Sequence, residues 1–275
     1  MVAAGELNPL ESIPSCPKPG ARALYLSRMR PYREYPLGSI SMHDSPRLRE
    51  LLAKSIARDR IRHVLETGTH EGLGSTRFLA ETFAAVAVPR SFVTIEANWR
   101  YWRRARRNLW KFSFVQPLWG ATLDVAAAIA FVQSDDVLKN HERYPDIFID
   151  DVEDPIGLYV RELRGELGEL PHDVRRRLLM RLQSWLYYRG ERLLEKHLRR
   201  LRGAMPLVVL DSAGGVGLLE FQTLITTMAE HPYLLLLDDI HHVKHFRSLA
   251  HIREDPSFEI IGLDESHGWV LARHG

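Results

Sequence analysis

The chain has 275 residues, of which 45% are hydrophobic and 26% charged, and its formal net charge is +2. This composition excludes wholesale disorder, and so small a charge argues against nucleic acid as a partner. The single cysteine, Cys16, excludes an internal disulfide bond and fits a reducing compartment. No apolar run approaches the roughly 18–20 residues that cross a bilayer, and the N-terminus lacks the features of a secretory signal. We therefore expect a cytoplasmic protein without a membrane segment.

Two parts are expected along the chain, an N-terminal arm over residues 1–44 and a main domain over residues 45–275. The arm is rich in proline and tyrosine, which break any helical or strand period. The main domain opens with a predicted helix that has Ser45 as its N-cap and leucines at helical spacing behind it.

Seven short apolar runs follow, and helical stretches separate most of them. Runs this apolar predict a mainly parallel sheet that is covered on both faces. The last two runs are joined only by DESHG, which suits a hairpin and gives an antiparallel edge strand. The prediction is a doubly wound, Rossmann-like α/β fold with seven strands. The runs are HVLET, SFVTIEA, FSFVQPL, PLVVLDS, YLLLLDD, FEIIGL and GWVLAR.

A helical insertion is predicted at about 151–205, where the alternation of strands and helices stops. Leucines recur there at helical spacing with arginines between them. The arginines suit a solvated face, a substrate lid, a docking patch for an anionic partner or the surface of a homodimer.

A glycine-rich turn follows the first apolar run, in the stretch HVLETGTHEGLGSTRFLAE. It lacks the lysine of a phosphate-binding loop, and two glycines of a dinucleotide fingerprint are missing. What fits is acid-x-Gly-x-x-x-Gly, formed by Glu66, Gly68 and Gly72, with Ser75 opening the next helix. A second acid, Glu96, ends the second run at the distance where a nucleotide ribose is usually held.

On these residues the chain resembles class I S-adenosylmethionine-dependent methyltransferases, over about residues 45–150 and 205–275. The resemblance implies that Glu66 faces the amino group of the cofactor and that Glu96 holds its ribose. Two departures stand out, since His70 replaces a glycine found in many members, and an acid often found near the adenine is missing. The resemblance assigns the cofactor to Glu66, Gly68, Gly72, Ser75, Glu96, Gly120 and Ala121.

An acidic cluster is expected from the later strands. Asp211 ends the fourth run, and Asp238 and Asp239 end the fifth, so that the three carboxylates converge on the cofactor side of the sheet. Such carboxylates repel one another unless a proton or a cation intervenes. The pattern is similar to that of metal-dependent small-molecule O-methyltransferases. This resemblance implies that the three aspartates bind Mg²⁺ and that Asp211 has a catalytic role.

Three histidines follow the cluster and leave two further arrangements open. His241 and His245 share a face if HHVKHFRSLAHI is helical, and with Asp238 they could bind a transition metal such as iron or zinc. Alternatively, His242 could be the general base for the acceptor hydroxyl.

The sequence therefore predicts an S-adenosylmethionine-dependent methyltransferase that methylates an oxygen of a small hydroxylated acceptor, assisted by a divalent metal. Two alternatives stay open, a non-catalytic binding or scaffold module on the same fold and a metal-dependent, hydroxylase-like enzyme of that fold. The acceptor itself is not encoded in any motif.

Overall fold

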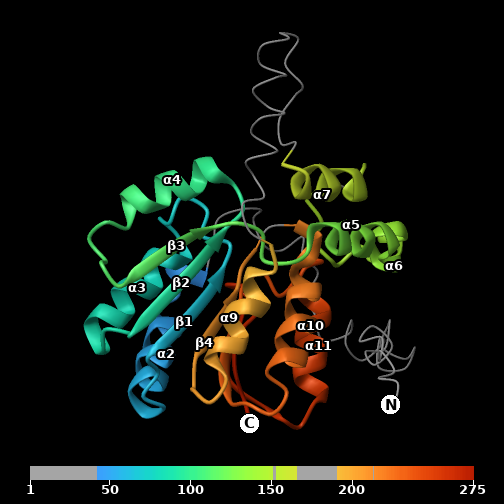
Figure 1. The fold of residues 1–275 in the computed structure, drawn as a ribbon. Coiled ribbons are helices and arrows are strands. Elements are labelled where there is room, and N and C mark those ends of the chain that lie inside the picture. The colour runs from blue at the N-terminus through green and yellow to red at the C-terminus, as the bar shows by residue number, and fades with distance from the viewer. Residues whose placement is uncertain (1–41, 151–152, 166–190, 213) are drawn as a thin grey trace, which may run out of the picture. The chain divides into compact units, whose positions relative to one another are not determined.

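A computed structural model describes residues 42–150, 153–165, 191–212 and 214–275, all within the unit Gly38–Gly275. Its centre is a seven-stranded sheet with the order β3-β2-β1-β4-β5-β7-β6 (Figure 1). The strands are β1 (His63–Thr67), β2 (Ser91–Glu96), β3 (Val115–Trp119), β4 (Leu207–Leu210), β5 (Tyr233–Leu237), β6 (Phe258–Asp264) and β7 (Trp269–His274).

The pairing of the strands confirms the predicted fold class. β1 to β5 run parallel, β7 pairs antiparallel with β5, and β6 completes the hairpin with β7. Each predicted run holds one strand, although β3 begins only at Val115 because Phe112 forms a turn in which its carbonyl accepts from the Val115 amide.

Helices cover both faces of the sheet (Figure 1). On one face α2, α3 and α4 pack against the side chains that include Val64 and Val209. On the other face α5, α7, α9, α10 and α11 pack against those that include Leu65 and Val208. Alternate residues of one strand thus enter two separate cores, which explains the nearly continuous apolar runs. The helices of the described chain are η2 (Met42–Asp44), α2 (Pro46–Arg58), α3 (Ser75–Val86), α4 (Trp99–Asn108), α5 (Val125–Ser134), α6 (Asp136–Lys139), η3 (His141–Arg143), α7 (Pro155–Leu163), α9 (Leu193–Leu201), η4 (Gly214–Val216), α10 (Gly217–Thr227) and α11 (Phe246–Glu254).

Helix α2 begins as predicted. Ser45 is its N-cap and accepts a hydrogen bond from the Leu48 amide, while Leu48, Leu52 and Ile56 are buried against the sheet. An apolar stripe at this spacing is what fixes a helix on a sheet.

The end of the predicted insertion belongs to the layer that covers the sheet. Leu194 and Leu198 of α9 are fully buried and join the core beneath β1 and α10. The arginines of α9 and its neighbour Arg192 lie outside, where Arg192 and Arg199 both pair with Glu195. The arm up to residue 41 and residues 166–190 of the predicted insertion lie outside the described residues.

Within the described residues, no helix combines the length and apolarity needed to cross a bilayer.

Candidate functional site

The carboxyl ends of the parallel strands meet at one edge of the sheet, which is where ligands bind in doubly wound folds. The ends of β1, β2, β4 and β5 each carry at least one acidic side chain. Glu66 lies on β1, Glu96 ends β2, Asp211 follows β4, and Asp238 and Asp239 follow β5. The topology therefore brings to one edge the acids that the sequence predicts as cofactor and metal ligands.

Glu66 is fully buried, and neither oxygen of its carboxyl group has a hydrogen-bond partner among the described residues. Burial raises its pKa to about 7, although the hydroxyls of Thr94, Thr76 and Ser75 nearby work in the opposite direction. A buried polar group without a partner costs free energy, so this carboxyl is either protonated or awaits a ligand.

Glu96 is also buried, but its carboxylate is held by two backbone amides. The His70 amide donates to Oε2 at 2.6 Å and the Asn98 amide donates to Oε1 at 2.7 Å. Burial raises its pKa to about 7, and the two amide hydrogen bonds partly offset that rise. His70 has a positive φ of 49° and its ring lies 4.1 Å from that of Tyr101, so this residue shapes the turn around Glu96.

The two glycines of the motif are required by the packing of the chain itself. Gly68 has a φ of 82°, and a Cβ there would lie 2.1 Å from the carbonyl oxygen of Asp211. Gly72 has a φ of 70°, and a Cβ there would lie 2.7 Å from Leu109. Both therefore have a structural reason to be glycine, and their contact with a cofactor stays a prediction.

The other predicted cofactor residues are held at the same edge. The Gly120 amide donates to the carbonyl of Glu96 at 3.0 Å, and the carbonyl of Ala121 accepts from the Leu193 amide at 3.2 Å. Ser75 is the first residue of α3 and is buried. Burial raises the pKa of both Glu66 and Asp211, and the Ser75 hydroxyl offsets a small part of that rise. The loop after β3 is thus fixed between β2 and α9.

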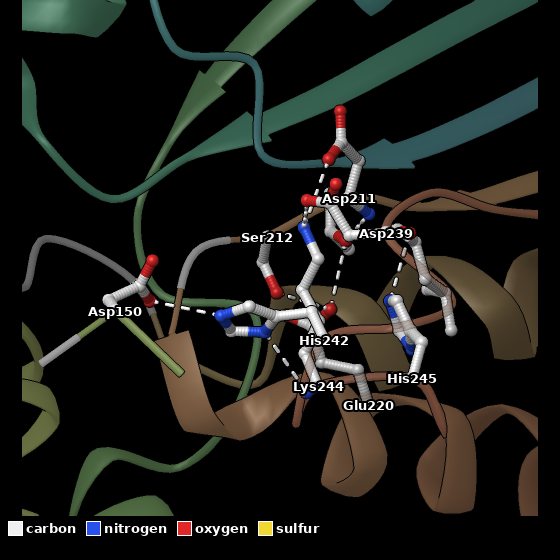
Figure 2. Close-up of polar contacts among 10 residues, drawn as sticks. Asp150, Asp211, Ser212, Glu220, Asp239, His242, Lys244 and His245 are labelled. Carbon is white, nitrogen blue, oxygen red and sulfur yellow. Dashed lines mark hydrogen bonds and ion pairs between the residues drawn. The ribbon is translucent and has the colours of Figure 1, made fainter. Parts of the chain in front are cut away.

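The three aspartates do converge, as the sequence predicts, and each offers an oxygen within 4.8 Å of the others. A lysine lies among them. The ammonium of Lys244 is 2.8 Å from Asp239 Oδ2 and 3.3 Å from Asp211 Oδ1, and only 5% of its side chain is exposed (Figure 2). The positive charge that these carboxylates need is therefore supplied by the chain itself.

The pKa shifts follow from this arrangement. Lys244 lowers the pKa of Asp239, whereas burial raises that of Asp211 and, together with the two neighbouring acids, raises that of Asp238 well above its ordinary value. Burial alone would lower the pKa of Lys244, but the carboxylates of Asp239, Asp211 and Asp238 together raise it. Lys244 is accordingly an ammonium ion.

A helix that includes the three histidines is not formed, because α11 begins only at Phe246. His241 and His245 precede it in turns, and each has Nε2 near a carbonyl oxygen, that of Glu265 at 2.9 Å and that of Leu210 at 3.1 Å. The described residues form no metal-ligand group that contains a histidine. The transition-metal arrangement thus loses the shared helix face on which it depended.

His242 lies in a chain of polar contacts that ends at Lys244. Its Nδ1 accepts from the Lys244 amide at 3.2 Å, so Nε2 carries the ring proton and donates to Asp150 Oδ2, also at 3.2 Å (Figure 2). This hydrogen bond lowers the pKa of Asp150. Both ring nitrogens are engaged, which leaves neither available to accept a proton in this arrangement. The general-base role of His242 stays a prediction.

Glu220 is buried at this edge of the sheet, although helical spacing in the sequence favours the polar side of its helix over a place near the pocket. It lies on α10, fully buried, and accepts hydrogen bonds from Thr67, Ser212 and Thr122 at 2.9, 2.8 and 2.5 Å. These three hydroxyls follow or end β1, β4 and β3. One carboxylate therefore joins three of the loops that border the site.

Lys244 and Asp150 are the functional candidates that the sequence misses. A lysine within HHVKHF looks like a solvated side chain in a linear sequence. The one available signal was the need of three adjacent aspartates for a cation, which could have directed attention to Lys244.

The strand order, with its reversed last strand, is that of the Rossmann-like methyltransferase fold, and this is the class of protein that the architecture defines. No protein-family model matches the sequence, and no curated protein matches it.

Solved structures with a similar fold include three methyltransferases. An O-methyltransferase from Bacillus cereus in complex with SAH has 14% identity and a TM-score of 0.44, over 94% of this chain and 92% of that chain. The O-methyltransferase TomG from Streptomyces achromogenes, involved in tomaymycin synthesis and in complex with SAM, has 14% identity and a TM-score of 0.41, over 91% and 88%. An SAH-bound methyltransferase from Podospora anserina has 13% identity and a TM-score of 0.42, over 97% and 92%.

Replacing Glu66 with glutamine should change how stability depends on pH. Between the ordinary pKa of 4.5 and the folded value of about 7, the native state keeps a proton that the unfolded state has lost. The free energy of unfolding therefore falls as pH rises through this range, by up to about 3 kcal/mol for this group. Glu66→Gln should remove that loss. In urea titrations of the ligand-free protein, the free energy of unfolding of the variant should therefore rise relative to that of the wild type from about pH 5 to about pH 8.

The control for this experiment is Glu259→Gln, on the exposed side of β6. This substitution should change the free energy of unfolding by the same amount at about pH 5 and at about pH 8. An identical pH dependence in Glu66→Gln and the wild type would contradict a raised pKa at Glu66.

Replacing Glu220 should destabilise the fold more than its place on a helix suggests. Glu220→Ala leaves three hydroxyls without an acceptor and opens a cavity, at a cost of about 3–5 kcal/mol, while Glu220→Gln keeps one acceptor and costs less. Gln222→Ala, on the same helix, is the matched control, because the amide oxygen of Gln222 has no hydrogen-bond partner. Equal unfolding midpoints for Glu220→Ala and Gln222→Ala would contradict the joining role of Glu220.

Proposed function

We propose that this protein is an S-adenosylmethionine-dependent methyltransferase that transfers a methyl group to an oxygen of a small hydroxylated acceptor. The observation that carries the proposal is the pair of buried acids at the ends of adjacent strands, Glu66 on β1 and Glu96 on β2, on a methyltransferase fold. Burial raises the pKa of both acids to about 7. Two such buried acids do not help a protein whose fold serves only a structural role, so they favour a functional site.

The ribose of the cofactor would be held by Glu96. Each of its oxygens accepts one backbone amide, and a carboxylate has about four lone-pair positions, so two are left for the ribose hydroxyls. The amides fix the direction of the carboxylate before the cofactor arrives. This preorganisation reduces the entropy that binding must lose.

The amino group of the cofactor would face Glu66, whose two oxygens have no partner among the described residues. An ammonium group would satisfy them directly or through water and would stabilise the ionised carboxylate. Gly68, Gly72 and Ser75 are proposed to border the methionine part of the cofactor, and Gly120 and Ala121 its adenine.

The cofactor supplies an electrophilic methyl group, so the chain has to position the acceptor oxygen in line with it and exclude water. Asp211 and Asp239, with Lys244 between them, form a polar wall at the ends of β4 and β5 that is suited to orient a hydroxyl group.

A divalent ion does not fit the cluster as it is arranged. Mg²⁺ would need oxygens of the three aspartates, and Lys244 holds Asp211 Oδ1 and Asp239 Oδ2. Burial raises the pKa of Asp238 well above its ordinary value, which makes this residue a poor ligand. We therefore derive no step of the reaction from a metal ion.

The first alternative is a non-catalytic scaffold, and the measurement of S-adenosylmethionine binding described below tests it. The hydroxylase-like alternative needed a histidine-bound metal, which the described residues do not assemble.

Calorimetry with S-adenosylmethionine tests the proposal through Glu96. Because the ribose hydroxyls need an ionised acceptor and the pKa of Glu96 is about 7, ionisation of Glu96 should tighten binding to the wild type by about tenfold between about pH 6 and about pH 8, and ionisation of Glu66 should add to this. Glu96→Gln should weaken binding by about 10–100-fold at the higher pH, since hydrogen bonds to a charged group are lost, and should leave only the smaller pH dependence that Glu66 contributes.

The matched control is Glu50→Gln, an exposed acid on α2 that should bind the cofactor like the wild type. Absence of binding to the folded wild type, or an unchanged affinity in Glu96→Gln, would contradict the proposal.

A further inference from the structure

Lys244 lies where a cation-binding cluster would hold its ion. Its ammonium touches Asp239 and Asp211 (Figure 2). The three aspartates offer oxygens within 4.8 Å of one another. Side-chain exposure is 5% for Lys244, 18% for Asp211 and 57% for Asp239. The lysine is thus the inner partner of the cluster, and Asp239 is the member that faces outward.

The backbone of Lys244 is fixed from two directions. The chain around it pairs with the segment after η3, because the Val243 amide donates to the carbonyl of Phe148 and the Phe148 amide donates to that of His241, both at 3.0 Å. On the other side lies Gly217, where a Cβ would approach the Cβ of Lys244 to 2.6 Å. The lysine therefore has little freedom to withdraw by moving its backbone.

His242 adds a third restraint on the same backbone. Its Nδ1 accepts from the Lys244 amide, and Asp150 fixes the opposite side of the ring. This makes His242 a positioning residue for Lys244. A histidine that holds the cation in place also accounts for why both ring nitrogens are engaged.

An ammonium and a divalent ion exclude each other at this position. Both would use Asp211 Oδ1 and Asp239 Oδ2, and a divalent ion at its usual distance of about 2.0–2.6 Å from these oxygens would lie beside the lysine charge. We propose that Lys244 is the resident cation of the cluster of Asp211, Asp238 and Asp239, and that it replaces a divalent metal ion there.

The assignment of Lys244 restricts which class of acceptor molecule can be bound. This restriction rests on the proposed methyl transfer. A metal ion favours acceptors that offer it two oxygens, as vicinal diols do. An ammonium has three hydrogens, of which Asp211 and Asp239 take two. The third suits a single acceptor oxygen, so we expect an acceptor with one isolated hydroxyl group.

Titration with Mn²⁺ alone, followed by electron paramagnetic resonance, tests the cation assignment. The wild type should bind no Mn²⁺ at the cluster up to about 1 mM, whereas Lys244→Met should gain one site that is at least about 100-fold tighter and is lost again in Lys244→Met/Asp239→Asn. Lys244→Arg keeps the positive charge and is the matched control, expected to behave like the wild type.

Two results would overturn the assignment. One is a Mn²⁺ site in the wild type that disappears in Asp239→Asn, and the other is a folded Lys244→Met that gains no site. If Lys244→Met does not fold, the wild type and its Asp239→Asn variant still decide the question. S-adenosylmethionine binding is measured on the same samples, so failure of the proposed function shows separately, as a wild type that binds neither cofactor nor Mn²⁺.

Discussion

A parallel sheet collects acidic side chains from several segments at one edge, and each acid buried there has to be hydrogen-bonded, paired or protonated. Four solutions occur side by side in this molecule. Glu220 accepts three hydroxyls, Glu96 accepts two backbone amides, and Asp211 and Asp239 share one lysine. Glu66 has no hydrogen-bond partner among the described residues, and burial together with the two neighbouring acids raises the pKa of Asp238. The partners of Glu220, Glu96, Asp211 and Asp239 all belong to the fold, whereas Glu66 is the acid for which we propose a contact with the cofactor.

The glycine turn shows how one residue can serve two demands. Gly68 must lack a side chain because the turn passes within van der Waals contact of the backbone at Asp211. The same contact ties the cofactor side of β1 to the start of the acidic cluster after β4. A substitution there would disturb both parts of the site, so loss of function at Gly68 could not by itself be assigned to a lost cofactor contact.

The strands could be predicted because each is an apolar run buried on two faces, and the hairpin because only the short stretch DESHG joins its two apolar runs. The positions of Glu66, Glu96 and the three aspartates then follow from topology, since parallel strands end at one edge. Lys244 could not be predicted in this way. Its place depends on a bridge between Phe148 and His242, two residues far apart in sequence, and the same bridge delays the start of α11 to Phe246. Local helical spacing was overridden by a tertiary contact.

The lysine also reproduces the charge that a metal-bound cluster would have. Three ionised aspartates with a divalent ion carry a net charge of minus one. Burial raises the pKa of Asp238 well above its ordinary value, which favours its protonated form; with Asp238 protonated, ionised Asp211 and Asp239 together with one ammonium would carry the same net charge. A sulfonium cofactor beside the cluster would thus meet the same net charge in either case. In the arrangement that we propose, Lys244 in place of the ion changes which acceptor oxygens can be held and leaves the net charge beside the methyl donor the same.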